Sequence, residues 1–257
     1  MNNSGQRPFL VLLWVTPRRC AVGVRLCVGG ISVRLTIRLC LAAGIGFAGI
    51  GATAADQGGQ AVDCPEIEVE VTAESPADRA LVCEGAIRAQ AFFRMHGIPV
   101  KHPIRIRLHP SAIEHYAFHI GVYDASQRRI DLLTPAAAKR RCRLQSPFDL
   151  PMDAQLYTSF VVHEVAHAIA DQNFEIRPAS QVAHEYIAYA AQLTMLPAAL
   201  RSEILQRYTV AGFDNIGDIS LTYQALDPSA FAVKVFRHYQ SLPNQGVFIR
   251  DLLSGTL

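Results

Sequence analysis

One short segment of the sequence places two histidines and a glutamate at a spacing suited to metal chemistry. His163 and His167 are four residues apart, and Glu164 follows the first histidine directly. On a helix, residues four apart lie one turn above each other on one face, so both imidazoles can bind the same metal ion. Glu164 projects near an open position of that ion, where it can take a proton from bound water and pass it to a leaving amine. The segment therefore predicts metal-assisted hydrolysis.

The residues around these side chains are apolar on nearly every side of the expected helix. They are Val161, Val162, Val165, Ala166, Ala168 and Ile169. Such a helix is buried. Because unpaired charge is costly to bury, two histidines and a glutamate on a buried helix need a partner, and a metal ion would supply one. The structural alternative is a buried helix whose histidines bond to the backbone and whose glutamate pairs with an arginine.

Residues 163–167 (HEVAH) resemble the HExxH motif of the zincin metallopeptidases, and the resemblance extends loosely to residue 191. Zincins are classified by their third zinc ligand. The metzincin pattern HExxHxxGxxH is not matched, because Ala170 and Asn173 occupy its glycine and final histidine positions. The metzincin branch is therefore excluded.

Gluzincins take their third ligand from a glutamate on a following helix. Glu185 lies eighteen positions beyond His167 and fits that role. The small residues that follow it would allow close helix packing: Ala188, Ala190 and Ala191. The resemblance implies that His163, His167 and Glu185 bind Zn²⁺ and that Glu164 is the general base and acid.

Two other side chains compete with Glu185 for the third position. Neighbours on a helix point about 100° apart, so only one of His184 and Glu185 can face the metal; the small residues after it favour Glu185. Glu175 would need a sharp reversal of the chain soon after His167.

The remaining pair at four-residue spacing, His115 and His119, has no glutamate at the motif position, and we expect no second metal site there.

The zincin resemblance also implies a substrate geometry. Zincins bind their substrate as an extra strand along a sheet edge above the HExxH helix, and a hairpin over residues 121–133 could supply that edge. A purely structural hairpin is the alternative. A histidine or tyrosine usually binds the developing oxyanion, and the candidates are Tyr189, Tyr223 and His238.

Strand patterns precede helix patterns along the chain. Alternating apolar residues predict strands at 67–71 and 104–108. The residues 124–127, which lie between segments 121–123 and 129–133, predict a hairpin with these two segments as its arms. Ser75 and Pro76 predict the start of a helix that ends at Gly97. Further helices are expected at 153–172, 179–195, 198–208, 228–241 and around Phe248, with Pro178 opening the second of these.

This order predicts an α+β, zincin-like fold. A small N-terminal sheet with one helix would be followed by a helical C-terminal part, and the metal would lie in the cleft between them. Residues 55–257 are long enough for a single domain with its own core.

Residues 1–54 have the composition of a leader. They contain six arginines and no acidic residue. A signal peptide is predicted by a basic segment at Arg34 and Arg38, an apolar run over 39–52 and the small-x-small sequence Ala52-Thr53-Ala54. We expect translation to start near Val28 or Val33. Beyond residue 54 the net charge is about −4, from 18 basic and 22 acidic residues, so we expect no nucleic-acid binding. The apolar run is short for a membrane span, and no stable span is expected after cleavage.

Three cysteines follow the leader, and an oxidising compartment would permit one disulfide. A bond between Cys64 and Cys83 is favoured by the short separation, although Cys142 could pair with either.

Taken together, the sequence predicts an exported, periplasmic or extracellular bacterial zinc metallopeptidase acting on peptides or proteins. The alternative is a non-catalytic zincin-scaffold binding domain of the cell envelope.

Overall fold

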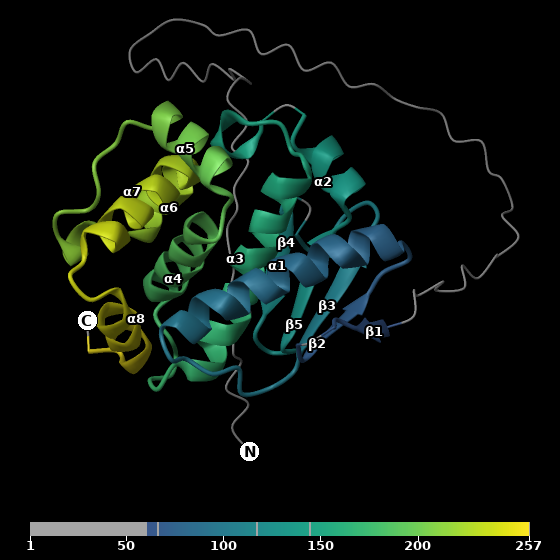
Figure 1. Ribbon diagram of the computed structural model, residues 1–257, viewed down its shortest axis with the longest axis horizontal. Coiled ribbons are helices and arrows are strands. Elements are labelled where there is room, and N and C mark those ends of the chain that lie inside the picture. The colour runs from purple at the N-terminus through teal and green to yellow at the C-terminus, as the bar shows by residue number, and fades with distance from the viewer. Residues whose placement is uncertain (1–60, 66, 117, 144, 257) are drawn as a thin grey trace, which may run out of the picture. The chain divides into compact units, whose positions relative to one another are not determined.

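The computed structural model of the protein describes residues 61–65, 67–116, 118–143 and 145–256, which all belong to one compact unit of the chain (Figure 1). The predicted signal peptide and its cleavage site lie outside the described residues. The described part is a mixed α+β fold with one five-stranded sheet and eight α-helices. The predicted fold class is therefore confirmed at this level.

Strands dominate the first half of the described chain. They are β1 (Ala61–Asp63), β2 (Val69–Thr72), β3 (Ile104–His109), β4 (Gly121–Asp124) and β5 (Arg129–Leu133). Their order in the sheet is β1-β2-β3-β5-β4, with β2, β3 and β5 parallel and the two outer strands antiparallel. Strand β4 is therefore an edge strand that pairs with β5, and the predicted hairpin is confirmed.

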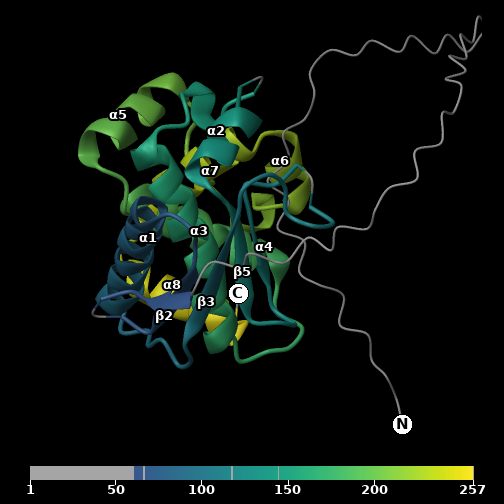
Figure 2. The ribbon, with the colours of Figure 1, turned by 90° about the vertical axis from the view of Figure 1, so that its right-hand side faces the viewer.

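Helix α1 (Pro76–Met95) packs against the sheet and against helix α3 (Ala154–Asn173). The Ser75 side chain accepts a hydrogen bond from the Asp78 amide and caps α1, as the sequence predicted. Ile104 and Ile106 of β3 are buried, whereas Arg105 between them is exposed. This alternation directs the apolar side chains to the face of the sheet that helix α1 covers and the polar ones to the other face. Helix α1 lies to one side of the strands in Figure 2.

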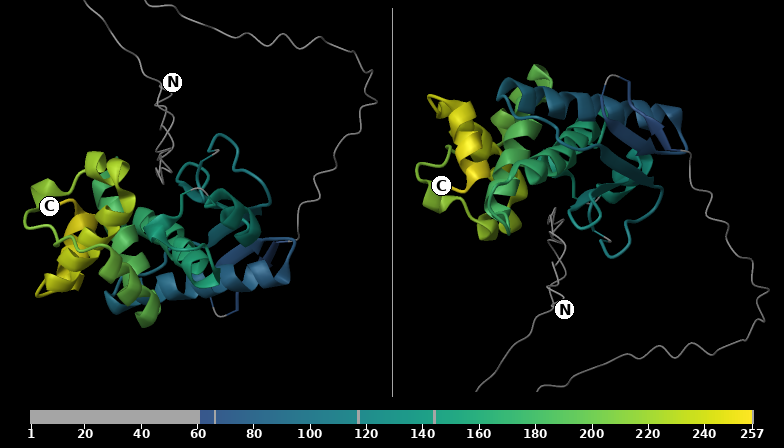
Figure 3. Two further views of the ribbon diagram at one scale, coloured as in Figure 1. Left: turned by 90° about the horizontal axis from the view of Figure 1, so that it is seen from above. Right: turned by 90° about the horizontal axis from the view of Figure 1, so that it is seen from below.

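The second half of the described chain is helical. Its α-helices are α2 (Pro135–Arg141), α3, α4 (Gln181–Thr194), α5 (Ala198–Arg207), α6 (Leu221–Leu226), α7 (Pro228–Ser241) and α8 (Gln245–Ser254), with short 3₁₀ turns at Pro147–Asp149 and Ile216–Asp218. Helix α3 contacts α1, α4 and strands β4 and β5, and α4 also packs on α7 (Figures 1 and 3). Helix α3 is thus the central element that joins the sheet to the helical part.

Several boundaries differ from the predicted ones. Pro178 does not open the helix that carries Glu185, because α4 begins at Gln181. The Ser180 side chain accepts a hydrogen bond from the Ala183 amide, and a serine satisfies the first free N–H groups of a helix in a way that Ala179 could not. Strand β1 and helices α2 and α6 were not predicted.

The disulfide joins Cys64 to Cys83 of α1, as predicted, and Cys142 is a buried free thiol. It ties the segment between β1 and β2 to the helix that covers the sheet. Among the described residues, no helix combines the length and the apolar character needed to cross a bilayer.

Candidate metal centre

Helix α3 presents His163, Glu164 and His167 inside the protein rather than at its surface. The Asp153 side chain accepts a hydrogen bond from the Leu156 amide at 2.8 Å and caps the helix. From Leu156 to Asp171 every residue of α3 is buried. The almost uniformly apolar pattern of the sequence is thus explained by a helix that is covered on all sides.

Helix α4 carries the third member of the group. Glu185, Tyr189 and Gln192 are spaced i, i+4 and i+7, which places them on one face of α4, and all three are buried. Ala188 and Ala191 are also fully buried. Side chains this small let α4 approach α3 closely.

The two helices bring His163, His167 and Glu185 together; we call these three residues the His–His–Glu cluster. The two histidine Nε2 atoms are 3.1 Å apart, and each lies 3.8 Å from a different carboxylate oxygen of Glu185. One ligand atom from each residue lies within 4.8 Å of the others. Ligand atoms that share one tetrahedral zinc ion are about 3.3 Å apart, so these distances suit a single ion.

Burial determines the electrostatics of the cluster. It lowers the pKa of His163 to about 3, and together with the neighbouring histidines it lowers the pKa of His167. Burial also raises the pKa of Glu185 to about 8. The burial of these three side chains thus disfavours their charged forms.

Glu164 lies beside the cluster on α3, and its side chain is also fully buried. Burial, followed by the negative charge of Glu185, raises its pKa, while the nearby backbone of Tyr123 acts in the opposite direction. Neither carboxylate oxygen makes a hydrogen bond of normal geometry within the described part of the chain. No arginine or lysine there forms an ion pair with Glu164 or Glu185, so the structural alternative for this helix is not supported.

Strand β4 lies directly against Glu164. A Cβ atom added to Gly121 would be 2.7 Å from the Cγ atom of Glu164, closer than side chains approach. A glycine at this position is therefore what allows the edge strand to reach the helix. Two residues on, the Tyr123 hydroxyl donates to Asp171 of α3 at 3.0 Å, and Arg177 also contacts Asp171. These contacts hold β4 over α3.

The rival ligands lie outside the cluster. The ring of His184 is 5.6 Å from that of His167 and 4.4 Å from that of Phe174, and His184 is not part of the group that could share a metal. Glu175 is exposed, and its amide donates to the carbonyl of Leu253. Of the two glutamates and the histidine considered, the structure places Glu185 beside both imidazoles.

One of the three candidates for binding an oxyanion touches the cluster. The Tyr189 ring is 4.5 Å from the ring of His163. His238 instead shares a hydrogen bond with the Tyr186 hydroxyl at 2.6 Å, and Tyr223 packs on Phe213 and Phe231. Only Tyr189 is therefore placed to act at the cluster.

Two glutamines support the cluster and were not predicted. Gln192 Oε1 is 3.2 Å from His163 Nδ1, and Gln224 Nε2 is 3.5 Å from Glu185 Oε2. Gln192 lies seven residues after Glu185, so helical spacing could have identified it. Gln224 comes from α6, and no local pattern points to it.

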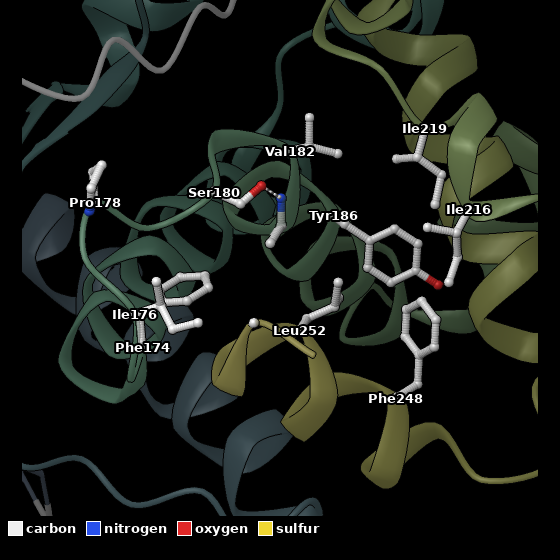
Figure 4. A pocket seen from close by; sticks show the side chains of 12 residues that line it. Phe174, Ile176, Pro178, Ser180, Val182, Tyr186, Ile216, Ile219, Phe248 and Leu252 are labelled. Carbon is white, nitrogen blue, oxygen red and sulfur yellow. Dashed lines mark hydrogen bonds between the residues drawn. The ribbon is translucent and has the colours of Figure 1, made fainter. Parts of the chain in front are cut away.

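A separate pocket lies between the loop after α3, the start of α4 and helix α8, with a volume of about 270 Å³ (Figure 4). Its walls are mainly apolar and include Phe174, Ile176, Tyr186, Phe248 and Leu252. Its polar groups have local partners: Ser180 caps α4, and Tyr186 bonds to His238. The pocket contains no imidazole or carboxylate, so it is distinct from the His–His–Glu cluster.

The fold and the site together define an α+β protein in which a buried His–His–Glu group lies between two packed helices. Residues 69–257 match a family of unknown function, DUF6639, and the chain belongs to this family. The match covers every residue of the cluster. No curated protein and no solved structure matches the chain.

Proposed function

We propose that this protein is an exported zinc-dependent metallopeptidase with a zincin-like fold. The observation that carries the proposal is the convergence of two imidazoles and one carboxylate in a buried site, where no arginine or lysine of the described residues pairs with the carboxylate. Buried ionisable groups are normally paired with each other or with a metal. A metal ion bound by His163, His167 and Glu185 would account for their arrangement.

The donor set favours zinc among the common metals. Two histidine nitrogens and one carboxylate oxygen are ligands typical of zinc, and three protein ligands leave one position open, as in catalytic sites. Bound zinc would polarise the scissile carbonyl and lower the pKa of a bound water.

Glu164 is the group that would move protons. It follows a ligand residue on the same helix, and its carboxylate has no competing hydrogen bond of normal geometry within the described residues. It can accept a proton from the attacking water and later donate it to the leaving amine. In this proposal Tyr189, beside His163, would bind the negative charge that develops on the substrate oxygen.

The substrate would lie along β4, in a cleft between the sheet and the helical part. Strand β4 is at the edge of the sheet, so its outer backbone groups could pair with an extended peptide. Gly121 places this strand against Glu164. A peptide paired with β4 would therefore pass close to the proton-transferring carboxylate.

The proposal of export rests on two features. The leader has the composition of a signal peptide, and Cys64 and Cys83 form a disulfide. Disulfides persist mainly in oxidising compartments, which supports a periplasmic or extracellular location.

The substitution Glu164→Gln tests the catalytic part of the proposal. We expect hydrolysis to fall by about 10²–10⁴-fold, the usual contribution of a general acid–base group, while the zinc content stays that of the wild type. Hydrolysis is measured by cleavage of a broad peptide library with and without chelator, and zinc content is measured by elemental analysis. Glu175→Gln, at an exposed position outside the cluster, is the control and should behave as the wild type.

Two results would count against this assignment. Full activity in zinc-loaded Glu164→Gln protein would remove Glu164 from the mechanism. Wild-type protein that binds zinc but cleaves no peptide would favour the non-catalytic binding domain instead.

A further inference from the structure

A chain of hydrogen bonds runs from the backbone of α3 to one histidine of the cluster. The Ser159 hydroxyl donates to the carbonyl of Leu156 at 2.7 Å. Gln192 Nε2 donates to Ser159 Oγ at 3.1 Å, and Gln192 Oε1 lies 3.2 Å from His163 Nδ1. Ser159, His163 and Gln192 are all buried, so water does not compete for these bonds.

The direction of this chain follows from its first member. A backbone carbonyl can only accept, so the single hydroxyl proton of Ser159 is used on Leu156. Ser159 Oγ must then accept from the amide nitrogen of Gln192, which turns the amide oxygen toward His163. An amide oxygen can only accept, so the proton of the neutral His163 ring lies on Nδ1 and the lone pair on Nε2.

The lone pair of His163 is thus directed into the cluster. Its Nε2 atom is the atom that lies 3.1 Å from His167 and 3.8 Å from Glu185. By contrast, His167 Nδ1 is buried and makes no hydrogen bond among the described residues. The two histidines are therefore held differently.

We propose that Gln192, oriented by Ser159, is a positioning residue that fixes the tautomer and the ring orientation of His163 for metal binding. This inference rests on the metal centre of the proposed function. It goes further by assigning the support of one ligand to a neutral amide rather than to a carboxylate. Groups that support a histidine ligand in this way typically contribute 10–100-fold to metal affinity.

The amide chemistry allows a test in which one substitution removes the hydrogen-bond acceptor and the other keeps it. Gln192→Leu removes the acceptor and should weaken zinc binding by about 10–100-fold. Gln192→Glu keeps the shape and an oxygen that can accept from His163 Nδ1, and in its protonated form it can still donate to Ser159 Oγ, so zinc should bind about as tightly as in the wild type. Ser159→Ala leaves the amide free to turn and should have an intermediate effect.

The measurement is zinc affinity, obtained by competition with a chromophoric chelator on the full chain. The matched control is Gln172→Leu, a glutamine of α3 whose amide bonds to the backbone at Lys101 and His102. It should leave zinc affinity unchanged. Thermal unfolding of each metal-free variant separates loss of zinc affinity from loss of folding. If Gln192→Leu does not fold, the zinc affinity of Ser159→Ala tests the same hydrogen-bond chain.

The outcomes separate this inference from the proposed function. Zinc binding by the wild type that is unchanged in Gln192→Leu, or equally weakened in Gln192→Leu and Gln192→Glu, would overturn the positioning role alone. A wild-type protein that binds no zinc would overturn the metal centre itself. Weaker zinc binding in Gln192→Leu together with retained binding in Gln192→Glu would support the role, because a residue that only fills space would not depend on keeping an acceptor oxygen.

Discussion

A group around Asp131 on the sheet and the His–His–Glu cluster both combine histidine with a carboxylate, and they differ in how the charge is balanced. On the sheet, Asp131 lies 2.8 Å from His109 and 2.9 Å from Arg129. Burial alone would raise the pKa of Asp131, but the hydrogen bonds and charges of these two neighbours outweigh it and lower the pKa. We call this group the Asp131 triad; each of its members has a partner in the protein.

The His–His–Glu cluster shows the opposite pattern. Burial raises the pKa of both Glu164 and Glu185, and no arginine or lysine among the described residues pairs with either carboxylate. The difference shows that residue types alone do not separate a structural ion pair from a ligand site. The informative feature is whether the surrounding protein satisfies the charge.

The largest effects are expected when the cluster loses a ligand. His163→Ala, His167→Ala and Glu185→Ala should each weaken zinc binding by more than about 100-fold, beyond what groups that merely support a ligand contribute. His184→Ala should bind zinc normally, because His184 lies outside the cluster. A metal count on the purified variants measures this, and loss of zinc in His184→Ala with retention in Glu185→Ala would reverse the ligand assignment.

Removal of the metal should destabilise the protein through the cluster and not through the Asp131 triad. A ligand at a thousand times its dissociation constant stabilises the native state by about 4 kcal/mol. Urea unfolding with and without chelator measures this difference at a stated free zinc concentration. The same shift is expected in Asp131→Asn. In Glu185→Ala it should be at most about 1.4 kcal/mol, because a site weakened 100-fold is left at ten times its dissociation constant, and a full shift in this variant would place the metal elsewhere.

A smaller effect is expected from closing the space over Glu164. In Gly121→Ala the new Cβ atom would lie 2.6 Å from Leu132 Cδ2 and 2.7 Å from Glu164 Cγ. We expect a loss of about 1–3 kcal/mol of unfolding free energy, typical of overpacking, together with reduced hydrolysis as Glu164 is displaced. In the control Gly217→Ala the nearest atom would be 3.5 Å away, and stability should not change. Equal stability of the two variants would contradict the close approach of β4.

The smallest effect is expected for the Asp131 triad. Asp131→Asn should cost on the order of 1 kcal/mol at neutral pH and leave zinc binding unchanged. Because the folded-state pKa of Asp131 is lowered, its contribution is present above the unfolded pKa of about 3.9 and is lost as the pH falls through the folded value. Urea unfolding at several pH values should therefore show the wild type and the variant converging in acid, and a constant difference would refute this electrostatic origin.

Much of the fold could be predicted because its signals are local. Helix α7 was predicted with its observed ends, since Pro228 begins it and the helical pattern stops at Ser241. The hairpin of β4 and β5 was predicted from the turn residues 124–127 between its two arms, and in the structure Asp124 accepts hydrogen bonds from the amides of Ser126 and Gln127. Helix α2 escaped prediction although Thr134 and Pro135 carry a capping signal. Strand β1 has three exposed residues and no alternation to detect.

The sequence by itself determined that His163 and His167 share one face of a helix with Glu164 beside them, because the geometry of a helix is fixed by local hydrogen bonds. Only the tertiary structure decided that Glu185 rather than His184 faces these imidazoles. That choice depends on the rotation of α4 about its own axis, which is set by the packing of buried residues such as Ala188 and Ala191 against neighbouring elements. The approach of Gln224 and Gly121 likewise depends on contacts between segments far apart in the chain, which no local pattern encodes.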